Sequence, residues 1–315
     1  MDLRLYILQR LFSLVIVLIG SSGVVFLIMR ALPGDPASAM MGLDTTPEMV
    51  EEMRRQLGLD QPLGKQYWDW VVAALQGDFG RSLAMRREVT DLVMSRFPIT
   101  LLLSFLALII AFIIAIPAGV LAAVHKGTWV DHVSRVVALA GVSMPSFWLG
   151  LLLILLFSSV LGWLPPGGYV SPMDNFGLSV AHIILPAFTL GTYYAATIAR
   201  MLRSSMLDVL NRDYILVAES LGISRRVVIW RDAFRNGLIP TLTVSGFAFG
   251  YMLSGTILIE VIFNIPGLGR LLYDGISYRD YTLVQGVVLF NIAIFVVVNF
   301  IVDVLYAVLD PRIRQ

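Results

Sequence analysis

Few side chains in this sequence have the types and spacing that catalysis or metal binding requires. No GxxxxGK[ST] segment occurs, so the chain supplies no Walker-type loop for the phosphates of ATP. Cysteine is absent, which excludes disulfides, thiolate metal sites and cysteine nucleophiles. The three histidines, His125, His132 and His182, form no helical ligand pair, so no metal site is expected. The sequence therefore predicts a chain that is not an enzyme and carries no cofactor of its own.

A short match to one hydrolase pattern lies near the N-terminus. Gly20, Ser21, Ser22 and Gly23 fit the Gly-x-Ser-Gly pattern of intramembrane serine proteases. Such a match is common by chance in a helix that contains glycine and serine, and His182 is the only histidine within an expected membrane span. An intramembrane protease is thus a disfavoured alternative.

The polar segment 200–236 is a stronger candidate for function, because it holds seven arginines between two long apolar runs. Its pattern predicts Asp213 as the N-cap of a short helix over 214–221. Gly222 is expected to end that helix in the left-handed conformation. A second helix is expected to start at Ser224, with an apolar face made of Val227, Trp230, Phe234 and Leu238. The segment is therefore predicted to be ordered.

The elements that must position this segment are membrane spans. Hydrophobic residues make up 57% of the chain and charged residues 14%, whereas charged residues are about a quarter of an ordinary soluble domain. A hydrocarbon core of about 30 Å takes roughly 20 apolar residues to cross. Suitable runs lie near 11–29, 99–124, 136–161, 179–199, 237–259 and 284–308. The sequence predicts an all-α membrane protein with six transmembrane helices.

Lysine and arginine predict the orientation of these spans. They gather near both chain ends, after the second span at Lys126 and Arg135, and after the fourth span in segment 200–236. The positive-inside rule then places both termini and segment 200–236 in the cytoplasm. The first apolar run exceeds the roughly 7 to 15 residues of a signal peptide, so it is expected to remain as a membrane anchor. A formal net charge of +1 gives no indication of nucleic-acid binding.

Charged side chains are scarce inside the expected spans. Spans two to five contain no ionisable residue except His182, whereas proton and ion pathways are built from such residues. Asp303, near the inner end of the sixth span, is expected either to be satisfied within the chain or to pair between subunits. This scarcity argues against an ion-coupled carrier or channel subunit, which stays the alternative function.

The fifth span has a face of small residues formed by Ser245, Gly246, Gly250 and Ser254. Gly246 and Gly250 have the GxxxG spacing that allows close helix packing. The same face could instead line a path in which backbone groups and small hydroxyls bond a polar solute. The sequence leaves both interpretations open.

Segment 32–97 is the one sizeable stretch outside the expected spans. One helix is expected to begin at Thr46 and Pro47 and to stop at Gly58. A second, over 64–76, carries aromatic residues. Trp68 and Trp70 on this helix, and Phe79 beyond it, belong either to an interfacial belt or to a docking surface for a substrate-delivering protein outside the membrane.

Several segments resemble those of one transporter family. They are LPGDP at 32–36, LGLDQP at 57–62, GDFGRS at 77–82, FNIPGLGRLL at 263–272 and DPRI at 310–313. With Ala218, Gly222 and the NGLIP run at 236–240, they are similar to the permease subunits of ABC importers, in the dipeptide, oligopeptide and nickel branch. The broad family pattern has Glu-Ala-Ala six residues before the glycine, and Leu216 and Val217 depart from it here.

The resemblance implies a type I ABC importer permease fold in the cell inner membrane. It implies an N-terminal transmembrane helix (1–31), an extracytoplasmic helical segment (32–97), a five-helix core (98–309) and a cytoplasmic tail (310–315). The loop that couples to the ATPase would then include Asp213, Tyr214, Ala218, Glu219 and Gly222.

The resemblance also implies partners and a function. The partners are a second, related permease chain, two ATPase subunits that bind ATP and Mg, and an extracytoplasmic solute-binding protein. The expected function is the import of peptides or a related small solute, with this chain forming half of the path. A dipeptide, an oligopeptide, glutathione, a nickel chelate and a sugar all remain open as the solute.

Overall fold

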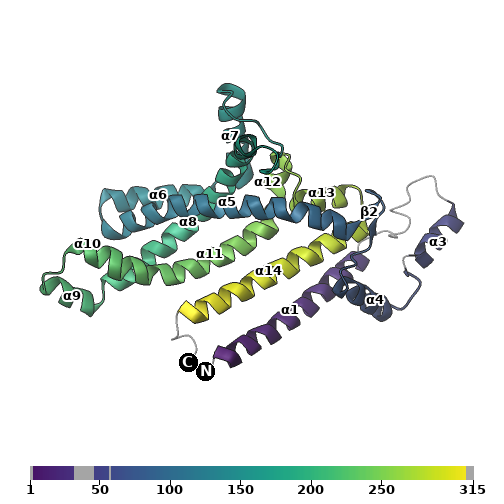
Figure 1. Ribbon diagram of the computed structural model, residues 1–315, viewed down its shortest axis with the longest axis horizontal. Helices are drawn as coiled ribbons and strands as arrows, with labels where there is room; N and C mark the ends of the chain where they lie inside the picture. The colour runs from purple at the N-terminus through teal and green to yellow at the C-terminus, as the bar shows by residue number, and fades with distance from the viewer. Residues whose placement is uncertain (1–2, 32–45, 57, 310–315) are drawn as a thin grey trace.

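The computed structural model describes residues 3–31, 46–56 and 58–309, so the LPGDP and DPRI segments and the expected tail 310–315 lie outside the described residues. The five long helices are α1 (Leu3–Ala31), α5 (Val89–Val124), α8 (Phe176–Leu210), α11 (Arg235–Gly255) and α14 (Tyr281–Leu309). Figure 1 shows them side by side along the long axis of the molecule.

Shorter elements connect the long helices. Before α5 come α3 (Pro47–Gln56), α4 (Leu63–Leu75) and an antiparallel pair, β1 (Arg81–Ser82) and β2 (Arg87–Glu88). Between α5 and α8 lie α6 (Trp129–Ser143), α7 (Ser146–Leu153) and the π-helix η1 (Ile154–Val160). Between α8 and α11 lie α9 (Asp213–Ser220), α10 (Arg225–Val227) and the π-helix η2 (Val228–Phe234). After α11 come α12 (Ile257–Ile262) and α13 (Leu268–Ser277).

Among the described residues, five helical segments are long and apolar enough to cross a membrane, and a bent pair brings the number to six if it counts as one span. The bent pair is α6 with α7 and η1, where a single span near 136–161 was predicted. Met144, which precedes Pro145, is extended at φ −81° and ψ 121°, because the proline ring disfavours a helical residue before it. The Met144-Pro145 pair in the sequence could therefore have predicted this break.

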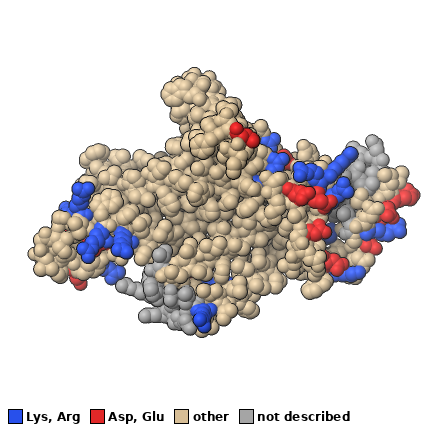
Figure 2. Space-filling view, viewed as in Figure 1, with Lys and Arg blue, Asp and Glu red and all other residues tan. Residues whose placement is uncertain are grey.

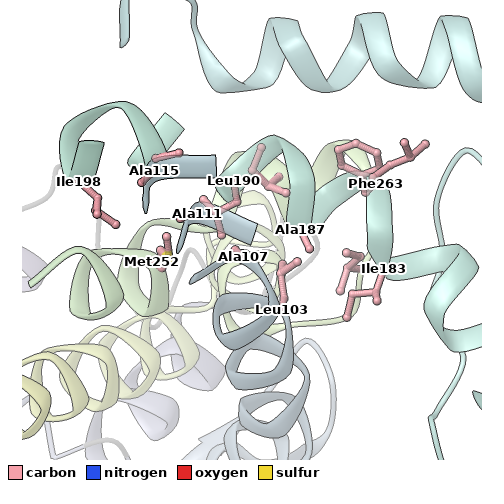
Figure 3. Close-up of a cluster of buried hydrophobic side chains, with 14 of the residues drawn as sticks. Leu103, Ala107, Ala111, Ala115, Ile183, Ala187, Leu190, Ile198, Met252 and Phe263 are labelled. Carbon is pink, nitrogen blue, oxygen red and sulfur yellow. The ribbon is translucent and has the colours of Figure 1, made fainter. Parts of the chain in front are cut away.

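The core lies between α5 and α8. Figure 3 shows Leu103, Ala107, Ala111 and Ala115 facing Ile183, Ala187, Leu190 and Ile198, with Met252 and Phe263 in the same cluster. Small residues bring the two backbones together: a Cβ on Gly191 would lie 2.6 Å from the carbonyl oxygen of Ala107. Burial of apolar surface does not drive helices together in a membrane, because the lipid tails are equally apolar. Small residues instead let the helices approach closely and gain van der Waals contacts.

The first and last long helices pack on each other. Arg10 Nη1 lies 3.3 Å from Asp303 Oδ2, so the expected partner of Asp303 is an arginine of the same chain. Further along α1, Phe26 lies edge-on to Tyr67 of α4, with ring centroids 5.5 Å apart. Ser22 shares a hydrogen bond of 2.8 Å with the Tyr67 hydroxyl, which gives the Gly-x-Ser-Gly match a structural role.

The segment before α5 follows the sequence expectations closely. The Thr46 hydroxyl accepts a hydrogen bond from the Met49 amide at 3.4 Å, and Pro47 is the first residue of α3. Gly58 has φ +64°, as a helix stop requires. The backbone amide of Glu48 and the Thr46 hydroxyl together hold the pKa of the exposed Glu48 carboxyl below its usual range.

The antiparallel pair is tied to the start of α14. The buried Ser82 hydroxyl donates to Asp280 Oδ2 at 2.7 Å, and Asp280 Oδ1 accepts from the Leu283 amide at 3.0 Å. Asp280 therefore caps α14 and anchors the GDFGRS segment with one carboxylate.

Charge is distributed by position along the molecule. In Figure 1, α9 and α10 lie at one end, and α3, α4, β2 and α13 lie toward the other. The start of α1 and the end of α14 point toward the end with α9. Figure 2 shows charged side chains toward both ends of this face and a broad band between them with few. Such a band is what a bilayer core demands.

Candidate functional sites: the α9 loop, the α11 face and the α13 end

We call residues 211–234, between α8 and α11, the α9 loop. Its helix α9 begins one residue earlier than predicted. The N-cap is Arg212, with φ −82° and ψ 145°, and Asp213 is already the first helical residue. The prediction of Asp213 as N-cap is therefore wrong by one position. At the first helical position its carboxylate still lies near the positive end of the helix dipole.

The end of α9 is as predicted. Gly222 has φ +80°, and its amide donates to the Glu219 carbonyl at 3.0 Å. The next amide, from Ile223, donates to the Ala218 carbonyl at 3.1 Å. These two bonds define a Schellman turn, which satisfies two terminal carbonyls of the helix.

The surface of α9 is apolar and uncovered. Ile215 is its one buried residue in the structure, at 2% exposure. Exposed hydrophobic residues surround it: Tyr214, Leu216, Val217 and Leu221. We call these four residues the α9 patch. A contiguous apolar patch outside the spanning helices is typical of a surface that binds another protein.

The helix that returns toward the core agrees with the prediction only in part. Of its predicted apolar face, Phe234 and Leu238 are partly buried against the core, but Val227 and Trp230 are 40% and 52% exposed. Val228 and Ala233 are fully buried instead. The reason is η2, in which the wider π-helical turn places residues five apart on one face.

A charge pair that sequence reasoning missed fastens this end of α8 to α6. The Arg203 guanidinium bonds both oxygens of Asp131, at 2.8 Å and 2.9 Å, in a bidentate arrangement. The Gly127 amide also donates to Asp131 at 3.0 Å, and the Asp131 side chain is only 2% exposed. Because the partners are 72 residues apart, no local pattern could have revealed the pair.

The small-residue face of α11 divides into parts with different surroundings. A Cβ on Gly246 would lie 2.7 Å from Val302 Cγ1, and one on Gly250 would lie 3.2 Å from the Phe295 ring. Both glycines therefore let α14 approach α11. Ser245 is buried and donates to the Thr241 carbonyl at 2.7 Å, while Ser254 is half-buried.

The three aromatic residues expected at the outer surface also differ from one another. Trp68 is 67% exposed. Trp70 packs at a tilt against Phe26 of α1, with ring centroids 6.1 Å apart, so it joins α4 to α1. Phe79 packs edge-on against Phe290 with centroids 6.2 Å apart. Of the three, Trp68 is the one that presents its ring to the outside.

The α13 end contains a buried carboxylate that the sequence analysis did not single out. Glu260 is 0% exposed. It accepts hydrogen bonds from the hydroxyls of Thr100 at 2.7 Å and Thr256 at 2.9 Å, and from the Arg270 amide at 2.9 Å. Thr100 in turn accepts from the Leu268 amide at 2.8 Å. We call this set the Glu260 network.

Glycines make room for the Glu260 network. A Cβ on Gly267 would overlap the Glu260 carboxylate, and one on Gly269 would lie 3.1 Å from Glu260 Oε2. The PGLGR part of the FNIPGLGRLL segment is thus shaped by this carboxylate. The isolated acid within the apolar run ILIEVIF was the sequence signal for it. Among the described residues, no group of three acidic or histidine side chains could hold a metal ion.

Long apolar helices, an exposed apolar loop at one end and a charge-poor middle define an integral membrane protein that exposes an apolar surface outside its spans. Residues 115–315 match the family model of the binding-protein-dependent transport system inner membrane component, and residues 3–104 match its N-terminal model. The chain belongs to this family.

Individual relatives agree with the family. The chain is 43% identical, over 98% of each sequence, to the glutathione transport system permease protein GsiC of Escherichia coli (strain K12). The protein of the same name from Shigella dysenteriae serotype 1 is equally similar, at 43% over 98% of each sequence.

Solved structures share the fold at low sequence identity. An inward-facing form of the MetNI methionine ABC transporter is similar with a TM-score of 0.57 and 18% identity, covering 70% of this chain and 96% of that one. An amino acid ABC transporter crystallised with histidines is similar with a TM-score of 0.50 and 19% identity, covering 71% and 94%.

These similarities confirm the type I permease fold and the function class. The protein is a permease subunit of an ABC importer in the inner membrane. They favour neither the ion-coupled carrier nor the intramembrane protease. The expectation that the chain is a transport component agrees with the family.

Proposed function

We propose that this chain forms half of the solute path of an importer of short peptides, with a glutathione-like solute as the first candidate. The observation that supports this most is the 43% identity to a glutathione transport permease over 98% of both sequences. In this proposal a second, related permease chain completes the path. Two ATPase subunits supply energy, and an extracytoplasmic binding protein delivers the solute.

The end of the molecule with α9 faces the cytoplasm in this proposal. Seven arginines lie between Arg200 and Arg235, and cytoplasmic loops are enriched in arginine and lysine. Both described chain ends point the same way, as an even number of crossings requires. The α13 end then faces the binding protein.

The α9 patch is the proposed contact with an ATPase. It offers apolar side chains, with Tyr214 at 50% and Leu216 at 61% exposure, on a helix held by a Schellman turn. Asp213 and Glu219 flank it with exposed carboxylates that can pair with basic residues of the ATPase. Ala218, half-buried, and Gly222 set the position of the helix.

The solute path is proposed to run along the part of α11 that α14 leaves uncovered. Gly246 and Gly250 serve helix packing, because both face α14. Ser254 is half-buried and stays the candidate for contact with solute, whereas the Ser245 hydroxyl is bonded to the Thr241 carbonyl of the same helix. On the outer surface, Trp68 is the proposed contact of the binding protein, with Trp70 and Phe79 holding its helix and loop in place.

A transport assay on the purified complex tests the proposal. The chain, with the subunits that co-purify with it, is placed in proteoliposomes with ATP inside and its binding protein outside. Labelled glutathione should accumulate only when both are present, and a non-hydrolysable ATP analogue should abolish accumulation. An unlabelled dipeptide should compete, whereas a sugar should not. Uptake that needs no ATPase subunit, or competition by the sugar alone, would contradict the proposal.

A further inference from the structure

A polar cavity lies at the α13 end, beside the Glu260 network. Its volume is about 360 Å³, and its lining includes Arg96, Tyr169, Asn264, Arg270 and Asp274. We call it the arginine pocket. It joins the start of α5, the loop between η1 and α8, and the loop that leads into α13.

The walls of the arginine pocket are fixed by bonds between distant segments. The Gly168 amide donates to the Phe263 carbonyl at 2.7 Å, and a Cβ on Gly167 would lie 2.7 Å from the Phe263 carbonyl carbon. On the other side, the Glu260 network holds the first turn of α13 against α5. The pocket therefore has its shape before any ligand arrives.

The two arginines of the pocket have donors to spare. Arg96 Nη1 donates to the Pro266 carbonyl at 3.2 Å, and Arg270 Nη1 donates to Asn264 Oδ1. Each guanidinium has five N–H donors. Within the described ranges, neither arginine forms an ion pair with a carboxylate, and both are half-buried.

Two acids lie nearby, and neither forms an ion pair with the arginines. The Glu260 oxygens are taken by two hydroxyls and an amide, and its side chain is fully buried. Asp274 lines the pocket, so the lining has two positive charges against one negative charge. A half-buried guanidinium in such a setting favours an anion that accepts two parallel hydrogen bonds.

We infer that the arginine pocket is a subsite for a carboxylate group of the transported solute. The solute occupies this subsite before it enters the path through the membrane. This inference rests on the proposed import of short peptides, each of which has at least one carboxylate. A volume of about 360 Å³ is near the lower limit of small-molecule sites, so it suits a terminal residue with its carboxylate. Asp274 then supplies an acceptor for a peptide N–H.

Chemical protection tests the subsite without requiring transport. Phenylglyoxal modifies accessible arginines, and mass spectrometry of the purified permease complex gives the rate at each position. N-acetylglycine and glutathione should each slow modification of Arg96 and Arg270, and N-acetylglycine amide should not. Arg87, an exposed arginine of β2, is the matched control and should react equally with every additive. Equal rates at Arg96 and Arg270 with and without the carboxylate probes would overturn the inference.

Uptake by variants separates this inference from the proposed function. Arg96→Gln and Arg270→Gln should each raise the glutathione concentration for half-maximal uptake about tenfold, since each loses a charge-assisted bidentate contact. Arg96→Lys and Arg270→Lys keep the charge without the planar fork and should recover only part of this loss. Arg87→Gln should match the unmodified chain.

The outcomes have distinct meanings. If the unmodified complex takes up no peptide but carboxylate protection persists, the proposed function fails and the subsite stands. If peptide uptake is normal in both Gln variants, the subsite inference fails and the importer function stands. If only the binding protein protects the two arginines, the pocket is a protein-docking socket, and the solute subsite is overturned.

Discussion

Single residues with an unusual backbone or an unusual burial decide local structure in this permease. Gly222 and Glu260 illustrate the two cases. Gly222 adopts φ +80° with open space around its α-carbon, so only backbone conformation restricts it. Glu260 is restricted by its partners, which come from α5, from α13 and from Thr256, the N-cap residue of α12.

Gly222→Val should uncouple the α9 loop. A β-branched residue at positive φ costs about 1 to 3 kcal/mol, and the strain is relieved if the Schellman turn opens and α9 moves. We expect normal membrane insertion, loss of uptake and loss of ATPase subunits on purification. Subunit stoichiometry and uptake measured on the same preparation check this.

Gly58→Val is the matched control for that substitution. Gly58 has φ +64°, and no atom lies within 4 Å of the place that a Cβ would take, but it lies between α3 and α4. Its substitution should leave the ATPase bound. Full ATPase content and normal uptake in the Gly222→Val complex would remove the α9 loop from the mechanism.

Glu260→Ala should destabilise the α13 end far more than Glu260→Gln. Alanine leaves two hydroxyls and an amide buried without an acceptor, at about 1 to 3 kcal/mol for each unsatisfied group. Glutamine has the same shape, its carbonyl can accept from the Arg270 amide, and the Thr100 and Thr256 hydroxyls can rotate to accept from its NH2. The thermal unfolding midpoint of the purified chain, followed by tryptophan fluorescence, should fall sharply for alanine only. Equal midpoints for the two variants would mean that the network contributes little.

These two residues also show what sequence could predict. The sequence alone predicted the role of Gly222, because the residues that signal the end of a helix are adjacent in the chain. Glu260 was missed because Thr100 precedes it by 160 positions, and nothing local marks that threonine as its partner. Only the isolated acid in an apolar run signalled that partners must exist.

At the scale of elements, the sequence predicted helices well and their interruptions poorly. The predicted runs near 99–124 and 284–308 lie inside α5 and α14. The run near 136–161 is broken at Pro145, and the run near 237–259 ends at Gly255 before α12 begins. Because hydropathy is averaged over a window of residues, it does not detect such breaks. The π-helix η2 shows the same limit, because a change from a four-residue to a five-residue step leaves composition unchanged.

Gly246→Leu should separate α11 from α14. Its Cβ alone would lie within 3.1 Å of three atoms of Val302, so the helices must move apart or tilt. Overpacking of this kind costs about 1 to 3 kcal/mol. We expect a lower unfolding midpoint and a reduced yield of monodisperse protein. Gly20→Leu in α1 is the matched control, since nothing lies within 4 Å of that position. If both variants behave alike, the GxxxG face does not hold α14.

Along its long axis the whole molecule has the α9 loop at one end and the Glu260 network and arginine pocket toward the other. The long-range ties at each end are different in kind. At the α9 end, α6 and α8 are joined by the Asp131–Arg203 ion pair. At the α13 end, the Glu260 network uses hydroxyls and amides. Each end is therefore held together by its own contacts.

Cysteine labelling tests which end faces the cytoplasm. The natural chain has no cysteine, so a single introduced cysteine is read without background. Ser224, exposed at the turn before α10, and Met173, 95% exposed in the loop before α8, suit the two ends. Ser82 does not, because it is fully buried against Asp280. In intact spheroplasts an impermeant maleimide should label Met173→Cys and not Ser224→Cys, and in inside-out vesicles the pattern should reverse. Because α8 separates the two positions, labelling of both from one side would mean that α8 does not cross the membrane, and the proposed contact of the α9 patch with an ATPase would fail with it.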